Sequence, residues 1–538
     1  MKRAILVVLS LLLAGCAFAA TLNVSSAANY ELKTAAGWTA LGVTQPNAQW
    51  YLGSGLAQDT TNYGSSVLAT GLTTGNEPSL AEGILAPHQS ANEFNGSANY
   101  LVIRDKTVLR PDASGLFTIL AIIRVPSDAT LSRPIFGKYN SPLSNEYTSY
   151  LHTNGTYRPY YGDVGGVERA VSGGVTNIRD DKWRLIGFAA DTVGVVDSVR
   201  VYVNGLQERG IVYLNPPIFQ TGTDSFKIGG DSDSKCKSTI AWIGVWTGKA
   251  LSNANIIAIS NAMVPTGTTA LPFPSIQSAI RQSTAADIIS IASGTYQETV
   301  DITKALTIVA ANTAYPNRPR LYGTGLPLTA GVDAIVNISS AAAAVSYLDI
   351  IGYATGCGTR DSLSATTGLW HHLLIDSCFV GYSAAATTLE PSLFYSTIDC
   401  ESIANSVGLR TVNSSVGATE LTVTDVSINN CATGVTQGTD WTVTENYNNF
   451  YGNTTARGVG VAVGANSIAL FPKFKAPAIY DYRLQFSSPL RAGGADAGSL
   501  GFYYIGAYPA TPPSGQGGMT WGGRGGWATT SYKWGRPE

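Results

Sequence analysis

Residues 274–310 constrain the fold more than any other part of the chain, because their apolar pattern changes from helical to extended spacing. Ile276 and Ile280 fall on one face of a short helix. Residues 288–291 then form a β-branched strand, and apolar residues alternate inward over residues 300–308. A helix that covers an apolar end and is followed by several short strands is how a chain begins to wind a parallel β-helix.

A loose repeat follows this opening, with short similar segments spaced by about 20 to 29 residues, the length of one solenoid turn. The repeated segments are residues 374–379, 398–403, 426–431 and 447–453. Residues 274–310 and the closing residues 471–510 resemble the ends of pectin-lyase-like proteins. The resemblance implies a right-handed single-stranded parallel β-helix over residues 275–510, in a superfamily that is extracellular and handles polysaccharide.

The first half of the chain, residues 21–264, is expected to form a β-sandwich. Long apolar runs at residues 117–124 and 240–246 read as buried strands. Asn204-Gly205 suits a hairpin turn, because both of its positions need positive φ. Ser252 is a fitting N-cap for a short closing helix.

The order of the motifs over residues 40–262 resembles a laminin-G-like, concanavalin-A-like jelly roll. The resemblance rests on LFTILAIIRV, IFGK, KWRLIGFAAD, VRVYVNG, FKIGG and IAWIGVWTGK in that order. It implies an all-β chain with an N-terminal concanavalin-A-like sandwich, a linker over residues 265–274 and the C-terminal β-helix. Such sandwiches most often bind glycans or protein surfaces, and the paired Glu residues of the hydrolase versions are missing from this sequence.

Aromatic residues supply the candidate glycan contacts. Tyr157, Arg158, Tyr160 and Tyr161 lie close together in the segment NGTYRPYYGD, which is expected to be a loop. Tyrosine rings stack on the apolar faces of sugars, so this loop is a candidate wall of a concave site. The alternative is a surface loop whose tyrosines cover the edge of the sandwich.

A candidate metal site is weaker. Asp231 and Asp233 lie in a Gly/Ser-rich loop and offer the oxygen ligands that Ca²⁺ prefers. Two carboxylates in such a loop more often belong to a turn. Ca²⁺ is therefore the one cofactor that the sequence suggests, and none is certain.

Catalytic chemistry in the second half would depend on carboxylates and a base. Asp399 and Glu401 are two residues apart and are expected to leave the same face of one strand, with Asp376 stacked one coil away and Arg410 on a nearby bend. Lyases and hydrolases on parallel β-helices need such acidic residues, and a lyase also needs an Arg or Lys base. The alternative is a set of solvated residues on the outside of a solenoid.

The cysteines do not follow a metal-binding pattern, because no C-x-x-C is present. After Cys16 the chain has Cys236, Cys357, Cys378, Cys400 and Cys431. The last four lie at strand-like positions of the expected β-helix, which favours small buried residues in the coil interior. Disulfides remain the alternative if the chain is exported.

Residues 1–20 have the charge and apolar run of an export signal. Two processing sites compete: a lipobox that would place a lipid on Cys16, and Ala17-Phe18-Ala19, which fits ordinary signal peptidase. The chain is therefore expected to be secreted, or to be an outer-membrane or cell-surface lipoprotein of a bacterium. A place in a phage or virus particle is the alternative.

The composition limits the classes of partner that the chain is expected to bind. Charged residues make up 13% of the chain and the net charge is −2, which argues against nucleic acid because phosphate binding needs a basic surplus. The chain is expected to contact a membrane only through an N-terminal lipid. The sequence does not indicate an oligomeric state. Residues 511–538, rich in Gly and Trp, are expected to lack a fold of their own.

The function expected from the sequence is non-catalytic recognition of a polysaccharide or cell-surface glycan by the jelly roll, with the β-helix as a rigid second module. One alternative is a polysaccharide lyase or glycoside hydrolase that acts through the β-helix. The other is an adhesin or a fibre component of a virion.

Overall fold

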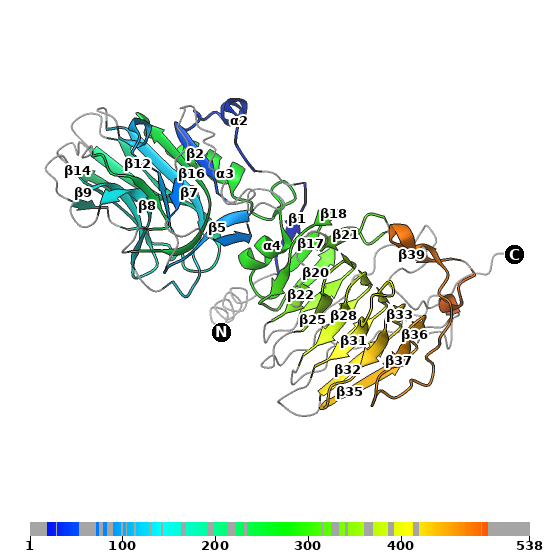
Figure 1. The fold of residues 1–538 in the computed structure, drawn as a ribbon. Coiled ribbons are helices and arrows are strands. Elements are labelled where there is room, and N and C mark those ends of the chain that lie inside the picture. The colour runs from blue at the N-terminus through cyan, green and yellow to red at the C-terminus, as the bar shows by residue number, and fades with distance from the viewer. Residues whose placement is uncertain are drawn as a thin grey trace, which may run out of the picture.

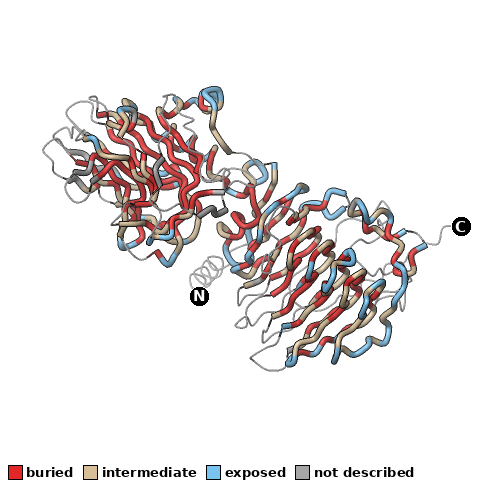
Figure 2. Tube along the Cα trace, viewed as in Figure 1, coloured by how far each residue is buried: buried red, intermediate tan, exposed pale blue. Residues whose placement is uncertain are grey.

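The computed structural model arranges the chain as two bodies, an antiparallel sandwich and a stack of parallel sheets (Figure 1). Buried residues line the strands of both (Figure 2). The structure describes residues 19–492 apart from residues 28–29, 53–71, 75–78, 83–89, 98–99, 104, 112–114, 130–131, 141–143, 163–167, 172, 192–196, 214–221, 231–233, 315, 324–332, 339–342, 360–368, 386–391, 413–418 and 486. Cys16 and the tail over residues 511–538 lie outside this description.

The sandwich consists of two antiparallel sheets. The first contains, in spatial order, β14 (Leu206–Tyr213), β13 (Asp197–Val203), β12 (Trp183–Asp191), β7 (Phe117–Arg124), β16 (Lys237–Thr247), β5 (Ser90–Asn95) and β4 (Ser79–Glu82), with β2 (Ala48–Tyr51) also paired to β16. The second contains β11 (Glu168–Ala170), β10 (Tyr157–Gly162), β9 (Ser144–Leu151), β8 (Arg133–Asn140), β15 (Phe226–Ile228), β6 (Leu101–Ile103) and β3 (Leu72–Thr74).

Strand β7 is apolar on both sides because both faces of its sheet are covered. Ile119 belongs to the core between the two sheets, whereas Leu120 and Ile122 belong to a second cluster with Trp242 and with apolar residues of helix α3 (Asn253–Met263). Burying one such side chain stabilises the fold by about 1.5–3 kcal/mol. The predicted run at residues 117–124 is therefore confirmed as a central strand.

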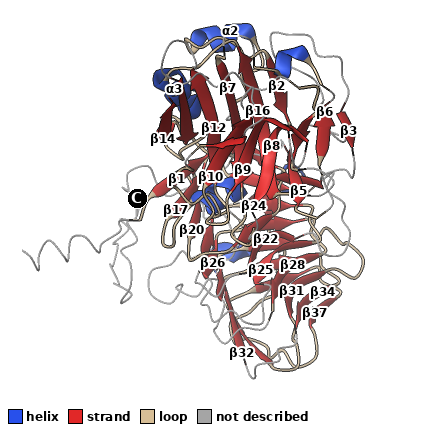
Figure 3. Cartoon of the chain, turned by 90° about the vertical axis from the view of Figure 1, so that its left-hand side faces the viewer, coloured by secondary structure: helices blue, strands red, loops and turns tan. Residues whose placement is uncertain are grey.

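Local signals in the sandwich are also confirmed. Asn204 and Gly205 join β13 to β14 with φ of 51° and 78°. Ser252 caps α3, and its hydroxyl accepts a hydrogen bond from the backbone N–H of Asn255. A short helix α2 (Ala35–Ala40) and a 3-10 turn η1 (Thr107–Leu109) also belong to this body, and Figure 3 shows α2 and α3 near the top of the sandwich in that view.

Three parallel sheets form the second body. The first contains β1 (Thr21–Val24), β17 (Ile288–Ile291), β20 (Thr307–Ala310), β23 (Ala344–Ser346), β26 (Leu369–His371), β29 (Ser392–Phe394), β32 (Thr419–Thr424) and β35 (Trp441–Asn446). The second contains β18 (Gly294–Tyr296), β21 (Pro319–Tyr322), β24 (Asp349–Ile351), β27 (Leu374–Asp376), β30 (Thr397–Asp399), β33 (Ser427–Asn429) and β36 (Asn449–Tyr451). The third contains β19 (Val300–Ile302), β22 (Asp333–Asn337), β25 (Thr355–Thr359), β28 (Val380–Ala384), β31 (Val407–Thr411), β34 (Thr433–Thr436) and β37 (Thr455–Arg457).

Consecutive strands pass through the three sheets in turn, so that each circuit of the chain stacks on the one before it. This order is compatible with the expected β-helix; its hand and its relation to pectin-lyase-like proteins stay predictions. The third sheet carries a stack of glycines, each of whose Cβ would meet an isoleucine side chain or the backbone of the next coil. They are Gly356, Gly381, Gly408 and Gly434.

Helix α4 (Ile276–Gln282) covers the first coil, as the apolar spacing predicted. Ile276, Ala279 and Ile280 are fully buried in the cluster that fills the parallel body. The backbone N–H groups of Ile276 and Gln277 donate to the carboxylate of Glu298, which satisfies the first turn of this helix.

One boundary differs from the expected one. Residues 21–24 were placed in the sandwich, but β1 pairs in parallel with β17, and Val24 is buried in the core of the parallel body. A four-residue strand carries too short a pattern to reveal its partner, and here the partner lies about half the chain length away.

The far end of the parallel body is closed by a short antiparallel hairpin, β38 (Phe474–Ala476) and β39 (Asp481–Leu484), together with 3-10 turns η2 (Pro477–Ile479) and η3 (Pro489–Ala492). Phe474, Tyr482 and Leu484 pack on Leu374 of β27, so the hairpin lies on the second sheet. This hairpin lies within the closing residues 471–510 expected from the sequence, of which residues 493–510 lie outside the described part.

The cysteines divide into two groups. Cys400 and Cys431 form a disulfide between neighbouring coils, so the expectation of unpaired buried cysteines is wrong for these two. It is confirmed for Cys357 and Cys378, which are free and buried, and Cys236 is likewise free and buried in the sandwich. A search of the described residues for a helix long and apolar enough to cross a membrane found none.

Candidate functional site

The predicted tyrosine loop is a strand. Tyr157 and Tyr161 lie on the inner face of β10 and are buried in the sandwich core, where the hydroxyl of Tyr157 lies 2.9 Å from Ser149 Oγ. Both are therefore core residues, and their prediction as glycan contacts is wrong. The alternation of a strand separates them from Arg158 and Tyr160, which face outward and are half-buried.

Arg158 and Tyr160 form a small outer surface with Tyr150 of β9. The rings of Tyr150 and Tyr160 meet edge to face with centroids 5.0 Å apart, and the Arg158 guanidinium lies 5.2 Å from the Tyr160 centroid. Arg158 Nε also donates to the carbonyl of Val171 at 3.2 Å. This surface keeps two of the four predicted contacts, on the open face of a sheet.

The predicted metal site cannot be placed, because Asp231 and Asp233 lie outside the described residues. Among the residues that are described, no group of three or more His, Cys, Asp or Glu side chains is arranged to hold a metal ion. Calcium binding at residues 231–233 stays a prediction.

A polar pocket of about 330 Å³ lies at the end of the sandwich that faces the parallel body. Its walls come from the ends of three neighbouring strands and the loop after β7. The lining residues are Glu93, Arg124, Pro126, Ser127, Asp128, Asp181, Lys237, Ser238 and Thr239. Arg124 ends the apolar run of β7, and Lys237–Thr239 begins that of β16, so long buried strands hold the charged residues in place.

Arg124 is the centre of the pocket's polar network. Its Nη1 donates to Asp181 Oδ1 at 2.8 Å and its Nη2 to Thr239 Oγ1 at 3.0 Å. Its guanidinium also lies 5.7 Å from the ring centroid of Trp183. Because the residue is only 7% exposed, these contacts fix it in one position, and a bound ligand would meet a preorganised cation.

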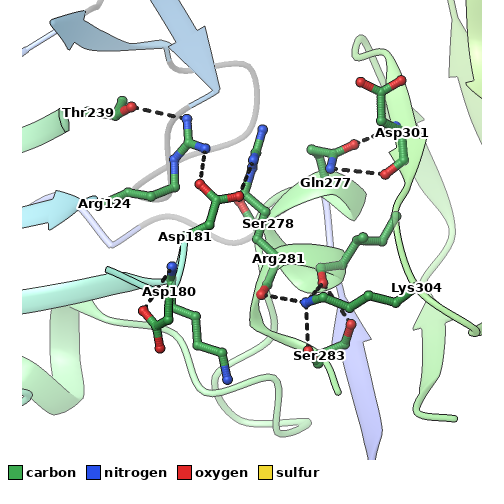
Figure 4. A network of polar contacts seen from close by, with 12 residues as sticks. Arg124, Asp180, Asp181, Thr239, Gln277, Ser278, Arg281, Ser283, Asp301 and Lys304 are labelled. Atoms are coloured by element: carbon green, nitrogen blue, oxygen red, sulfur yellow. Dashed lines mark hydrogen bonds and ion pairs between the residues drawn. The ribbon is translucent and has the colours of Figure 1, made fainter. Parts of the chain in front are cut away.

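Asp181 joins the pocket to the parallel body. While Oδ1 accepts from Arg124, Oδ2 accepts from Nη1 of Arg281 in α4 at 2.8 Å, and Figure 4 shows the two guanidinium groups on opposite sides of this carboxylate. Gln282 Nε2 also donates to the carbonyl of Trp183 at 3.1 Å. The pocket wall and the helix that covers the first coil therefore share one carboxylate.

The rim of the pocket offers both charges. Lys237 pairs with Asp128, and both side chains are exposed. Glu93 lies on β5, opposite Thr239 of β16 in the sheet register. With carboxylates, a guanidinium, an ammonium and hydroxyls within one cavity, the pocket can donate to and accept from a ligand that carries many hydroxyl groups.

The carboxylates predicted for catalysis lie on the second parallel sheet. Asp376 and Asp399 end neighbouring strands and are paired in register, so the prediction that they stack is confirmed. Asp376 is fully buried, and Tyr482 of β39 donates to its Oδ1 at 3.1 Å. Asp399 accepts from Asn430 Nδ2 at 3.1 and 3.2 Å. Tyr482 thus covers the pair from outside.

Burial and mutual repulsion change how this pair ionises. Burial, followed by repulsion from Asp399 and Glu401, raises the pKa of Asp376 to about 8. Burial likewise raises the pKa of Asp399. Near neutral pH the pair therefore holds a protonated Asp376, which is a proton donor that the covering hairpin keeps from solvent.

Glu401 and Arg410 do not complete this pair as expected. Glu401 has a φ of 47° and lies in the turn after β30, where its backbone N–H donates to Asp399 Oδ1 at 3.0 Å, so it does not share a strand face with Asp399. Arg410 lies on β31 in the third sheet and donates from Nε to Ser383 Oγ at 3.4 Å. The predicted acid and base residues are thus divided between two sheets.

Part of the sandwich matches a known family model, and the chain resembles several solved structures. Residues 95–257 match the family model described as the Concanavalin A-like lectin/glucanases superfamily. No curated protein sequence matches the chain.

Among solved structures, the chain is similar to the binding domain of Paraclostridial Mosquitocidal Protein 1, with 13% identity, 40% of this chain and 52% of that chain covered, and a TM-score of 0.32. It is similar to domain 4 of AbnA, a GH43 extracellular arabinanase from Geobacillus stearothermophilus in complex with arabinotriose, with 17% identity, coverage of 40% and 98%, and a TM-score of 0.31. The chain spans about half the length of the first of these structures. Residues 95–257 are a concanavalin A-like jelly roll within a longer chain.

Proposed function

We propose that this chain is an exported protein that binds a glycan in the polar pocket of its sandwich, with the parallel body as a rigid second module. The observation that carries the proposal is a pocket of about 330 Å³, lined by charged and hydroxyl side chains, in a domain that matches the concanavalin A-like lectin and glucanase superfamily. Its volume lies at the lower end of the range of about 300–1,000 Å³ for small-molecule sites.

The chemistry of the pocket suits sugar hydroxyls. Carboxylates such as Asp128 and Glu93 accept hydrogen bonds from vicinal hydroxyls, and Arg124 and Lys237 donate to ring and hydroxyl oxygens. Arg124 and Lys237 lie at the ends of long buried strands, so holding them in place costs little on binding. Tyr160, on the outer face of β10 in the other sheet, is a separate candidate stacking surface for a sugar ring.

The parallel body fits the second part of the proposal. We infer that it is a right-handed β-helix related to pectin-lyase-like proteins, because its strands pass in turn through three parallel sheets and a helix covers the first coil. Its coils share one continuous apolar core that includes residues from Val24 to Phe450. Such a stack resists bending and would hold the sandwich at a fixed distance from whatever the C-terminal end contacts.

The test is a glycan array followed by calorimetric titration of the strongest ligand. Asp128→Ala and Glu93→Gln should each weaken binding by tenfold or more, because each removes an acceptor from the pocket, which corresponds to about 1.4 kcal/mol. Asp440→Ala removes an exposed carboxylate of the parallel body and serves as the matched control. Array signal that survives both pocket variants would remove the pocket from the proposal.

A second candidate function is a polysaccharide lyase or hydrolase that acts through the parallel body. The specific observation in its favour is that two carboxyl groups lie side by side in register, and that burial raises the pKa of both, to about 8 for Asp376. Against it, Tyr482 covers the pair. The test is to incubate the chain with uronate polysaccharides and follow unsaturated products by absorbance. Product formation that is lost in Asp399→Ala would favour the enzyme function over non-catalytic binding.

A further inference from the structure

We propose that the mature chain begins at Ala20, released by hydrolysis of the Ala19–Ala20 peptide bond, and that its new α-ammonium group forms an ion pair with the nearly buried carboxylate of Asp287. The proposal rests on the export proposed above. It chooses between the two processing sites that the sequence left open, and it assigns a structural role to the residue at the cut.

Ala20 lies at the point where the chain joins the parallel body. The backbone N–H of Ile288 donates to the carbonyl of Ala20 at 2.8 Å, and the pairing of β1 with β17 continues from Thr21 to Val24. Ala19 and Ala20 are exposed, whereas Val24 is fully buried. Ordered pairing therefore begins at Ala20, directly after the peptide bond that would be cut.

The backbone nitrogen of Ala20 contacts the carboxylate of Asp287. Asp287 is only 4% exposed, and its Oδ1 accepts from that nitrogen at 2.9 Å. Its Oδ2 accepts from the backbone N–H and the hydroxyl of Thr284 at 2.7 and 2.9 Å. Burial opposes ionisation of Asp287, but the hydrogen bonds from Thr284 and Ala20 and the charge of Lys304 outweigh it and lower its pKa.

The negative charge of Asp287 calls for a cation at the nitrogen of Ala20. A carboxylate with little exposure is better matched by an ammonium than by a neutral amide. Lys304, whose charge acts on Asp287, already donates from Nζ to the carbonyls of Ile280, Arg281 and Ser283 at the end of α4. A free amino group on Ala20 would therefore place a positive charge against an oxygen that otherwise has only an amide donor.

The sequence before Ala20 supplies the matching cleavage signal. Ala17 and Ala19 place small residues at the third and first positions before the bond, as signal peptidase requires. A membrane-bound signal peptidase would add water across the bond: the hydroxyl goes to the carbonyl of Ala19 and the proton to the nitrogen of Ala20, which takes a further proton from solvent. No other reactant is needed.

Lipid attachment at Cys16 fits this end of the molecule less well. It would leave residues 17–19 between the lipid and Ala20, a reach of about 14 Å when fully extended. The nitrogen of Ala20 would remain an amide, and the carboxylate of Asp287 would be held close to the bilayer without its cation. Residues 16–18 themselves lie outside the described part of the structure.

The first experiment reads the N-terminus. The full chain with its own leader is produced in a bacterium that has both ordinary and lipoprotein signal peptidases, and the folded product is analysed by N-terminal sequencing and intact mass. The expected result is an unmodified chain that begins at Ala20. A chain that begins at lipidated Cys16, at any other residue, or that keeps its leader would overturn the proposal. Glycan binding plays no part in this measurement, so its failure and that of the proposed function are separate outcomes.

The second experiment tests the ion pair itself. Chains that begin at Ala20 are compared with chains that carry Gly-Ser before Ala20, each as wild type and as Asp287→Asn. The extension should lower the unfolding temperature of the wild type by a few degrees and leave Asp287→Asn nearly unchanged, and the difference should fade as pH rises well above about 8, where an α-amino group loses its proton. An equal effect of the extension in both backgrounds would contradict the ion pair.

Discussion

In the sandwich, Arg124, Asp128 and Lys237 surround an open pocket, whereas in the parallel body Asp376 and Asp399 lie beneath Tyr482. The charged groups of the pocket are paired with partners of opposite charge, Arg124 with Asp181 and Lys237 with Asp128, and they line an open cavity. The two aspartates have each other and amide or hydroxyl donors instead. The difference favours the pocket of the sandwich as the proposed binding site, because the acidic pair of the parallel body is covered by the closing hairpin.

The largest expected effect is the pH dependence that Asp376 gives to the free energy of unfolding. The pKa of Asp376 rises from 3.8 to about 8 on folding, so between these values the folded chain holds a proton that the unfolded chain has lost. The free energy of unfolding should therefore fall as pH rises from about 4 to about 8, by an amount on the order of several kcal/mol, since one pKa unit corresponds to about 1.4 kcal/mol. Denaturant titrations over this pH range measure the slope.

Asp376→Asn provides the comparison for that slope. It should flatten the pH dependence and raise the stability of the parallel body at pH 8, because an amide still accepts from Tyr482 and carries no charge. Asp440→Asn, at an exposed carboxylate, should leave the slope as in the wild type. A slope that persists unchanged in Asp376→Asn would mean that the pair is solvated, and the account of a closed end would fail.

The next effect tests how tightly the coils stack. A Cβ at Gly408 would lie 2.5 Å from Ile428 Cγ2 and 2.6 Å from the carbonyl oxygen of Gly434, so Gly408→Ala should cost about 1–3 kcal/mol. Gly37→Ala in α2 is the matched control, because its Cβ would meet nothing closer than 3.5 Å. Scanning calorimetry should show a lower transition for Gly408→Ala alone; equal transitions would contradict tight stacking.

The smallest effect concerns the junction. Arg281→Ala removes a partly exposed ion pair with Asp181 and should cost no more than about 1 kcal/mol. It should nevertheless broaden the distribution of overall dimensions in solution scattering, because Asp181 connects α4 to the pocket. Lys249→Ala removes an exposed cation elsewhere on the sandwich and should change neither quantity. Identical scattering of both variants would show that other contacts hold the two bodies.

Much of this fold follows from apolar spacing. The run in β7, the hairpin turn at Asn204 and Gly205, the N-cap Ser252 and helix α4 all rest on patterns within a dozen residues, and all are confirmed. Strand β1 could not be assigned in this way, because its partner β17 is distant in sequence and parallel pairing leaves no local turn signal.

The candidate site was less accessible from sequence for a related reason. The pocket unites Glu93, Arg124, Asp181 and Lys237, which are brought together only by the sheet order. The available signal was limited to Arg124 at the end of the apolar run of β7 and Lys237 at the start of that of β16. Arg410 was misplaced because each coil has three strands, and loose spacing does not say to which sheet a residue belongs.

The most direct test of the account is hydrogen exchange measured by mass spectrometry on the full chain, with and without the strongest ligand from the array. The account predicts protection in peptides that contain Arg124–Asp128 and Lys237–Thr239, and no change in peptides that contain Asp376 or Asp399. Protection confined to the peptides with Asp376 and Asp399 would contradict it, because the glycan would then occupy the parallel body.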